Sequence, residues 1–362
     1  MTYDFEPLKE AQILQSGFFQ WIVERHQIYR NRLEGKPFGE WSDDHWLENY
    51  KFTNPFREND RETIWMRKNF TPVSELNSPY YPKQGLTYRD ATLKNNIVNA
   101  ALYRMVGTKE FAEEFLFSHG WITENNYNPK LIKEIIEKRI KHKERCFTGA
   151  YIITNQGIKA PKSEVVIDRF ITPLYEDIVL DTTNFPMNNT ASFMQQRLMH
   201  YQLMDFQGFG GGGFMAYEVV CDLTYMPTYR GNASFYESWE ELQQKATLED
   251  FVSDRYFWAN AGPGALRGLN RIWGRFLTSR MNFAESVAKM KHLLSYKKLI
   301  AEISAERGYK PINPKDIDMR CIEHSLCEYD KYMRVLRGEG RPRSVTKYKE
   351  GQVYPVERGP VE

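Results

Sequence analysis

Apolar residues recur along most of the chain with a period close to 3.6, which predicts a mainly helical protein. Helices are expected at about 18–29, 92–106, 283–306 and 321–337. A further helix should begin at Pro129, because Asn128 is a good N-cap residue and proline fits the first helical position.

Signals for β-strands are few. The best candidate is CFTGAYIIT at 146–154, which ends at Asn-Gln-Gly and could form a short hairpin arm. The Pro-, Ser-, Asn- and Tyr-rich stretch 71–88 is expected to be a surface loop. We therefore expect one mostly helical domain over 1–337, with lobes of about 1–145 and 146–337 if it divides.

The last residues, 338–362, are rich in glycine, proline and charge. This composition predicts a flexible basic tail. Two interpretations of the tail stay open: a solvated end, or a basic arm that touches phosphates.

Composition limits the functional classes. The chain has 362 residues with 49 Lys and Arg against 47 Asp and Glu, so nucleic-acid binding would need a local basic patch. No apolar run approaches about 18 residues and no signal peptide is evident, so we expect no membrane span and a cytoplasmic location. The four cysteines form no CxxC pair, and no HExxH motif or Cys/His cluster occurs, so reduced thiols and no metal are expected.

The stretch Gly208–Gly213 satisfies the pattern GxGxxG, but a dinucleotide fingerprint needs a preceding strand. The residues before it, 193–207, have a helical pattern, so no nicotinamide or flavin cofactor is expected. A phosphate-binding GxxxxGK[ST] motif is also absent from the sequence, which argues against a Walker-type kinase. The better interpretation is a tight glycine turn that enters a helix at 214–223.

A Gly262-Pro263-Gly264 turn runs into an apolar-patterned helix that carries Arg267. In a DNA-binding hairpin, the backbone N–H groups of such a turn and the helix dipole accept a phosphate oxygen, and an arginine adds a charged contact. An ordinary helix-entry turn explains the same residues.

Two other segments combine charges at helical spacing. Arg57, Asp60 and Arg61 would share one helix face, either as a surface ion-pair cluster or as two guanidiniums for phosphate beside a carboxylate for proton transfer. In 322–334, Glu323 and Asp330 lie on one face of a predicted helix, while the reverse face is apolar.

These blocks occur in a fixed order: WSDD (41–44), YKFTNPFRENDR (50–61), GFGGGGFMAYEVVCDL (208–223), GPGALRGL (262–269) and EHSLCEYDKYMR (323–334). Together they resemble the family of α-glutamyl/putrescinyl thymine pyrophosphorylases. They are similar also to the helical domain attached to 5-hydroxymethyluracil DNA kinases of bacterial viruses. The resemblance covers about residues 15–337.

The resemblance implies a helix-hairpin-helix DNA-glycosylase-like helical bundle and double-stranded DNA with a modified pyrimidine as partner. It implies that a flipped, phosphorylated 5-hydroxymethyl uracil loses its phosphate or pyrophosphate to an amine co-substrate, an amino acid or polyamine. A glycosylase that excises the base, or a DNA-binding module without catalysis, are the alternatives. Without a Walker motif we expect the stand-alone transferase or glycosylase branch.

Site residues follow from the same resemblance. The acids expected to be catalytic are Asp60, Asp222 and Glu323, of which Asp60 or Glu323 would deprotonate the amine. Residues expected to bind the substrate are Asn54, Arg57, Arg61, Lys331 and Arg334, the arginines at 57 and 61 neutralising the leaving group. Residues expected to contact DNA are Gly262, Pro263, Gly264 and Arg267.

Overall fold

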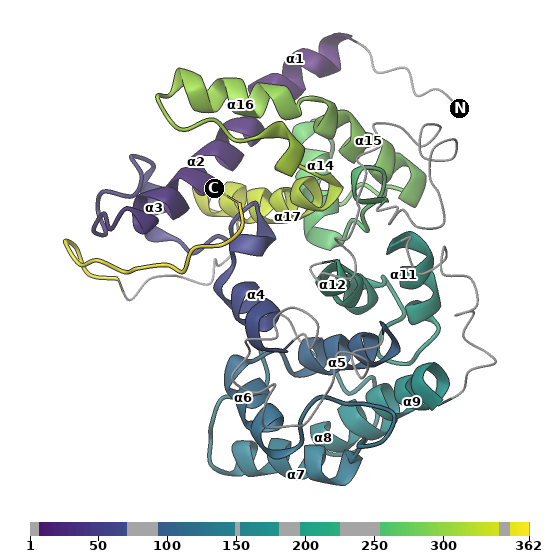
Figure 1. Ribbon diagram of the computed structural model, residues 1–362. Helices are drawn as coiled ribbons and strands as arrows, with labels where there is room; N and C mark the ends of the chain where they lie inside the picture. Colours follow the sequence, from purple (N-terminus) through teal and green to yellow (C-terminus); the bar gives the residue numbers. More distant parts are fainter. Residues whose placement is uncertain are drawn as a thin grey trace. The chain divides into compact units, whose positions relative to one another are not determined.

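The computed structural model of the protein describes residues 7–70, 93–148, 153–180, 196–224, 254–339 and 348–361. These residues are mainly helical, as the hydrophobic pattern predicts (Figure 1). They contain no β-strand, and their one extended pairing is an isolated antiparallel bridge between Pro37 and Val353. No helix among them is long and apolar enough to cross a bilayer.

The chain divides into two compact units. Unit 1 combines Met1–Arg61 with Arg255–Glu362, and unit 2 is the continuous stretch Glu62–Asp254. The boundaries between the units therefore lie after Arg61 and after Asp254, and not near residue 145, where the sequence suggests a division into lobes. The helix-hairpin-helix arrangement expected from the resemblance stays a prediction.

Unit 1 is built around its last long helix, α17 (Met319–Leu336), which begins where the Asp318 side chain accepts a hydrogen bond from Cys321 N. Helices α2, α3, α14 and α15 contact it. The tract 283–306, expected as one helix, is two helices that meet at Tyr296. The helices of unit 1 are α1 (Pro7–Gln15), α2 (Phe18–Leu33), α3 (His45–Asn49), α14 (Pro263–Ile272), α15 (Phe283–Ser295), α16 (Lys297–Glu306) and α17.

Helices α14 and α17 pack closely because two glycines of α14 face α17 (Figure 1). A Cβ atom on Gly264 would lie 2.3 Å from Cys327 Sγ, and one on Gly268 would lie 2.4 Å from the carbonyl oxygen of Leu326. Only hydrogen fits at these positions, so the glycines after the Gly-Pro turn fix the distance between the two helices.

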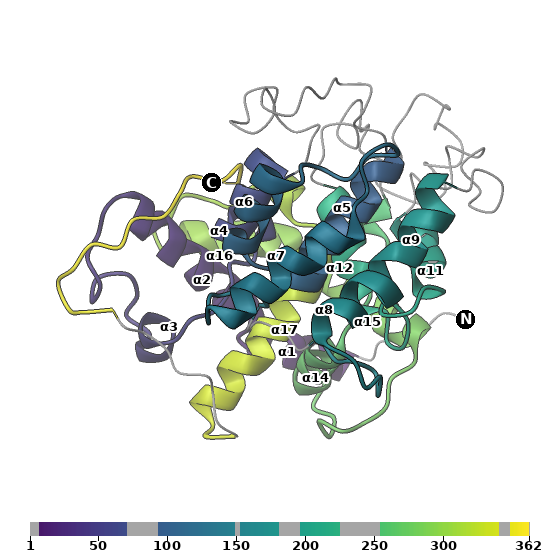
Figure 2. The same cartoon turned by 90° about the horizontal axis from the view of Figure 1, so that it is seen from below.

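Unit 2 has one apolar core to which most of its helices contribute. Within it, α5 (Leu93–Val106) packs against α12 (Phe214–Leu223), as Figure 2 shows. Its other helices are α4 (Arg61–Trp65), α6 (Lys109–Ser118), α7 (Pro129–Lys141), α8 (Lys162–Glu164), α9 (Thr172–Tyr175) and α11 (Gln196–Met204), with π-helical turns at Met66–Phe70, Val165–Ile171 and Glu176–Leu180.

Several local predictions can be compared with unit 2. The N-cap at Asn128 is confirmed, since its Oδ1 accepts a hydrogen bond from Leu131 N at 3.0 Å. The strand expected at 146–154 is not found at 146–148 or 153–154, and residues 149–152 lie outside the described part. The loop expected at 71–88 also lies outside the described residues.

The glycine turn at 208–213 serves close packing inside unit 2. A Cβ on Gly208, whose φ is +93°, would lie 2.6 Å from the Phe170 ring. A Cβ on Gly213, whose φ is +69°, would lie 2.5 Å from His200 Nε2. The turn thus brings its backbone against neighbouring side chains and leads directly into α12.

Candidate functional site

A pocket of about 290 Å³ in unit 1 contains three of the predicted site residues, Asn54, Asp60 and Arg61. We call it the Asp60 pocket. The other residues that line it come from α2, α3, Trp41 in the loop between these helices, the segment 50–59 and the C-terminal residues 348–357. The charged and aromatic ones among them are Arg25, Arg32, Lys51, Glu48, Glu357, Tyr29, Trp41, Tyr50, Phe52 and Tyr348.

The segment that carries Asp60 does not form one regular helix. Asn54 Oδ1 accepts a hydrogen bond from Phe56 N at 2.9 Å, which makes a turn, and a short 3-10 helix follows at Arg57–Asn59. Asp60 then has extended backbone angles, φ −73° and ψ 135°. The single helix face predicted for Arg57, Asp60 and Arg61 is therefore wrong, and Arg57 does not line the pocket.

Two arginines of α2 give the pocket its positive charge. Arg25 Nε donates to Phe52 O at 2.8 Å, while its Nη1 is buried without a hydrogen-bond partner among the described residues. Burial, and after it the charge of the nearby Arg32, lower the pKa of Arg25 to about 10, although Glu328 and Asp60 act in the opposite direction. The guanidinium stays charged at neutral pH, so a bound anion would be stabilised here.

Aromatic rings cover one side of this positive charge. The Arg32 guanidinium carbon lies 4.6 Å from the centre of the Trp41 ring, and Trp41 and Tyr348 pack edge to face at 5.1 Å. Tyr348 also lies 4.4 Å from Tyr354. Flat rings beside guanidinium groups suit a planar heterocycle that carries negative charge.

The C-terminal residues 348–361, here called the C-terminal wall, complete the pocket. Phe38 N donates to Gln352 O at 2.8 Å, which holds the wall near the bridge to Pro37. Asn59 Nδ2 donates to Val361 O at 2.6 Å, and Val361 N donates back to Asn59 Oδ1 at 3.2 Å. Asn59 directly precedes Asp60, so the wall also fixes the chain next to the acid.

Helix α17 supports the pocket from outside. Lys331 Nζ donates to Lys51 O at 2.7 Å and lies 3.2 Å from Glu328 Oε2, which also accepts from Thr53 N at 2.8 Å. Lys331 and Arg334 do not line the pocket, although both were predicted to bind substrate. Lys331 therefore helps to position the segment at Lys51, which lines the pocket. Arg334 instead donates a hydrogen bond from its Nε to Glu339 O at 3.4 Å.

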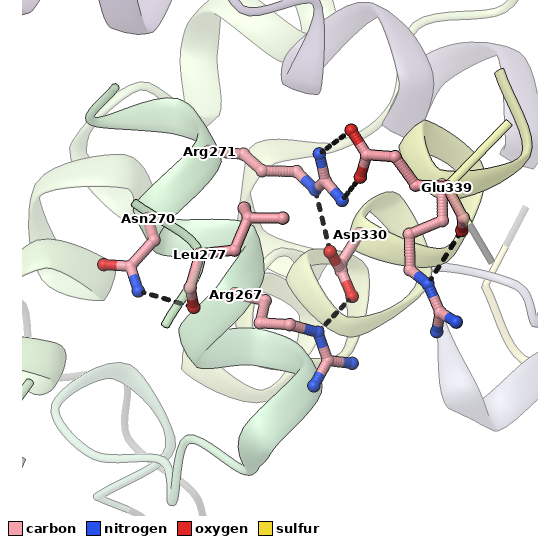
Figure 3. A network of polar contacts seen from close by, with 7 residues as sticks. Arg267, Asn270, Arg271, Leu277, Asp330 and Glu339 are labelled. Carbon is pink, nitrogen blue, oxygen red and sulfur yellow. Dashed lines mark hydrogen bonds and ion pairs between the residues drawn. The ribbon is translucent and has the colours of Figure 1, made fainter. Parts of the chain in front are cut away.

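The predicted DNA-binding hairpin lies at the start of α14, close to Glu323 of α17, and Asp330 of α17 contacts α14 further along. Glu323 Oε1 lies 3.5 Å from Gly262 N, and this acid does not line the Asp60 pocket. Asp330 is 1% exposed and accepts from Arg267 Nε at 2.7 Å and from Arg271 Nε at 2.8 Å (Figure 3). Asp330 thus organises the contact between α14 and α17, a role that the sequence indicates only through the i, i+4 pair of arginines.

The third predicted acid, Asp222, belongs to unit 2. It is fully buried on α12, and both of its carboxylate oxygens accept hydrogen bonds from Arg104 of α5. Arg104 Nη1 also lies 3.0 Å from Glu218. This ion pair joins α5 and α12 in the core, and the catalytic role of Asp222 stays a prediction.

No group of three or more His, Cys, Asp or Glu side chains that could hold a metal ion occurs in the described part of the chain. The Asp60 pocket itself offers cations that can bind an anion, rings that can stack on a base, and the Asp60 carboxylate, which can accept a proton.

Comparison with known proteins places this mainly helical chain among the helical domains of DNA kinases. The chain belongs to the family "5-hmdU DNA kinase, helical domain", which matches residues 12–341. This confirms the resemblance to the helical domain of 5-hydroxymethyluracil DNA kinases.

Among individual proteins, the chain is similar to the 5-hmdU DNA kinase of Bacillus phage SP10. The two are 25% identical over 339 residues, which cover 89% of this chain and 45% of the relative, so the chain spans less than half the length of that protein. No solved structure matches the chain. The family match ends at residue 341, so the C-terminal wall lies outside it.

Proposed function

We propose that the protein modifies a base in DNA and that the Asp60 pocket receives a uracil flipped out of the duplex. The base would carry a phosphorylated hydroxymethyl group at C5, and an amine such as an amino acid or polyamine would displace the phosphate or pyrophosphate from its methylene carbon. The observation that carries this proposal is that Arg25, Arg32, Lys51 and Arg61 line one pocket together with aromatic rings and three carboxylates, Asp60 among them. The name of the phage relative supports a substrate of this class.

The proposed reaction has three parts. Flipping the base costs a few kcal/mol, which stacking on Trp41 and Tyr348 would offset. The amine nitrogen attacks the exocyclic methylene carbon, a C–N bond forms, and the C–O bond to the phosphate or pyrophosphate breaks. The leaving group departs with the electron pair towards the Arg25 and Arg61 guanidiniums, and Asp60 takes the proton that the amine loses.

The test is mass spectrometry of nucleosides after the protein is incubated with duplex DNA that contains 5-phosphomethyluracil, with and without amines. We expect an amine-bearing base still in the strand, together with released phosphate. A free base and an abasic site would instead support the glycosylase alternative, and unchanged nucleosides in bound DNA would support the non-catalytic module.

The role of Asp60 is tested by Asp60→Asn, which keeps the side chain's shape and removes its charge. We expect this variant to bind DNA normally and to lose amine transfer. The matched control is Asp205→Asn, at an exposed aspartate of unit 2, which should keep wild-type turnover. Full activity of Asp60→Asn would contradict the assignment.

The two predicted acids that do not line the pocket are part of the same test. Glu323→Gln and Asp222→Asn should slow amine transfer if these acids take part in it. If either variant keeps wild-type turnover and a wild-type fold, its predicted catalytic role is wrong.

A further inference from the structure

A second pocket, of about 670 Å³, adjoins the first in unit 1. Trp41 lines both pockets. Two consecutive residues of the C-terminal wall line one pocket each, Glu357 the Asp60 pocket and Arg358 the second pocket. The two pockets are therefore neighbours that share an indole and a stretch of backbone.

The second pocket differs from the first in its chemistry. Its cationic side chains outnumber its carboxylates five to three, and amide groups and a glycine backbone make up much of the rest. The aromatic rings in its wall are Trp41 and Tyr309, so a base has less surface to stack on. The five cations are Arg30, Lys36, Arg307, Lys310 and Arg358, and the three carboxylates are Glu34, Glu40 and Asp43.

Several of these cations are held in place by the fold. Arg30 is only 7% exposed, and its Nη1 donates to the backbone oxygen of Lys310. Lys36 Nζ lies 2.9 Å from Asn31 Oδ1. Arg307, which also lines the pocket, forms an ion pair with Glu24, a residue that does not line it. Cations fixed before a ligand arrives lose little freedom when they bind an anion.

We propose that the second pocket binds backbone phosphates of the DNA strand whose base enters the Asp60 pocket. This inference rests on the proposed function, because it needs a flipped nucleotide next door. A flipped nucleotide stays covalently joined to its flanking phosphates, so a cationic pocket directly beside the base pocket is well placed to bind them. The volume exceeds that of one phosphate and leaves room for the bridging water that is common at DNA interfaces.

The experiment measures the affinity of the full chain for unmodified duplex DNA over a range of salt concentrations. The variants are Lys310→Gln and Arg358→Gln. Each should weaken binding for every sequence tested and should reduce the slope of log affinity against log salt by about 1, as expected for one lost phosphate contact. The double variant should reduce the slope by about 2.

Matched controls come from exposed cations of unit 1 that line neither pocket. Lys315→Gln is the control for Lys310→Gln. The backbone oxygen of Lys315 accepts a hydrogen bond from Tyr256, just as the backbone oxygen of Lys310 accepts one from Arg30. Arg280→Gln is the control for Arg358→Gln, and its backbone oxygen accepts from Arg275. Both controls should keep the wild-type slope.

The outcomes separate this inference from the proposed function. A reduced slope in the two variants supports the phosphate pocket even if no amine transfer is observed. An unchanged slope overturns it, even if amine transfer occurs as proposed. Equal losses in variants and controls would also overturn it, because binding would then depend on net charge and not on this pocket.

Discussion

Replacing Asp222 by alanine should destabilise unit 2 and thereby show that this acid is structural. The substitution leaves Arg104, which is 6% exposed, without its two-oxygen partner in the core. Breaking a buried ion pair by removing one partner costs about 3–5 kcal/mol. Glu218 stays 3.0 Å from Arg104 Nη1 and compensates in part, so we expect about 3 kcal/mol.

The assay is urea unfolding of the full chain, read through hydrogen exchange at amides of α5 and α12 so that unit 2 is observed separately from unit 1. In a thermal experiment the same loss corresponds to a melting temperature lower by roughly 6–12 °C. The control is Glu134→Ala, which removes an exposed partner 4.0 Å from Lys130 and should cost less than about 0.5 kcal/mol.

The contrary result is equally clear. If Asp222→Ala lowers the free energy of unfolding of unit 2 by less than about 1 kcal/mol, the ion pair does not stabilise the core as argued. A variant that folds normally and yet loses turnover would return Asp222 to the catalytic role predicted from the sequence.

Three further predictions concern unit 1. In Gly359→Ala the new Cβ would lie 2.2 Å from Asn59 Oδ1, so proteases should cleave the C-terminal wall faster than in Gly212→Ala, where the Cβ meets nothing within 4 Å. Gly268→Ala forces α14 away from a carbonyl of α17 and should cost about 1–3 kcal/mol in chemical denaturation. Burial and then the charge of Arg30 lower the pKa of His26 to about 3, so only the unfolded chain binds a proton below about pH 6.5. Stability should therefore fall as the pH drops from about 6.5 towards 3, by up to about 1.4 kcal/mol per pH unit, and His26→Gln should remove this slope.

Local signals in the sequence identify helices well where the interactions that form them are local. The bounds of α12 agree with the predicted 214–223, because a glycine turn precedes the helix and its apolar residues lie close together in the chain. The break at Asp60 could not be predicted in the same way. The residue before it, Asn59, is hydrogen-bonded to Val361, which lies 302 residues further along the chain.

The candidate site was likewise predictable only in part. Asn54, Asp60 and Arg61 belong to one sequence block and meet in one pocket. Arg25 and Arg32 were missed, because charged residues on an amphipathic helix are usually solvated. Their spacing of seven residues, which places both on one side of α2, was the available signal. For Asp222 the apolar neighbours Val219 and Leu223 indicated burial, but nothing local pointed to Arg104.

The two halves of the Asp60 pocket differ in origin, which separates its proposed chemistry from its selectivity. The acid and the cations lie at 25–61, inside the segment that the family match covers, whereas Tyr348 and Glu357 lie beyond its end at residue 341. The C-terminal wall is attached through main-chain hydrogen bonds at Phe38 and through the side chain of Asn59, and neither of these residues is one of the pocket's cations. Removing residues 348–361 from this chain would therefore leave the anion-binding groups in place and take away the part of the wall that would face the base.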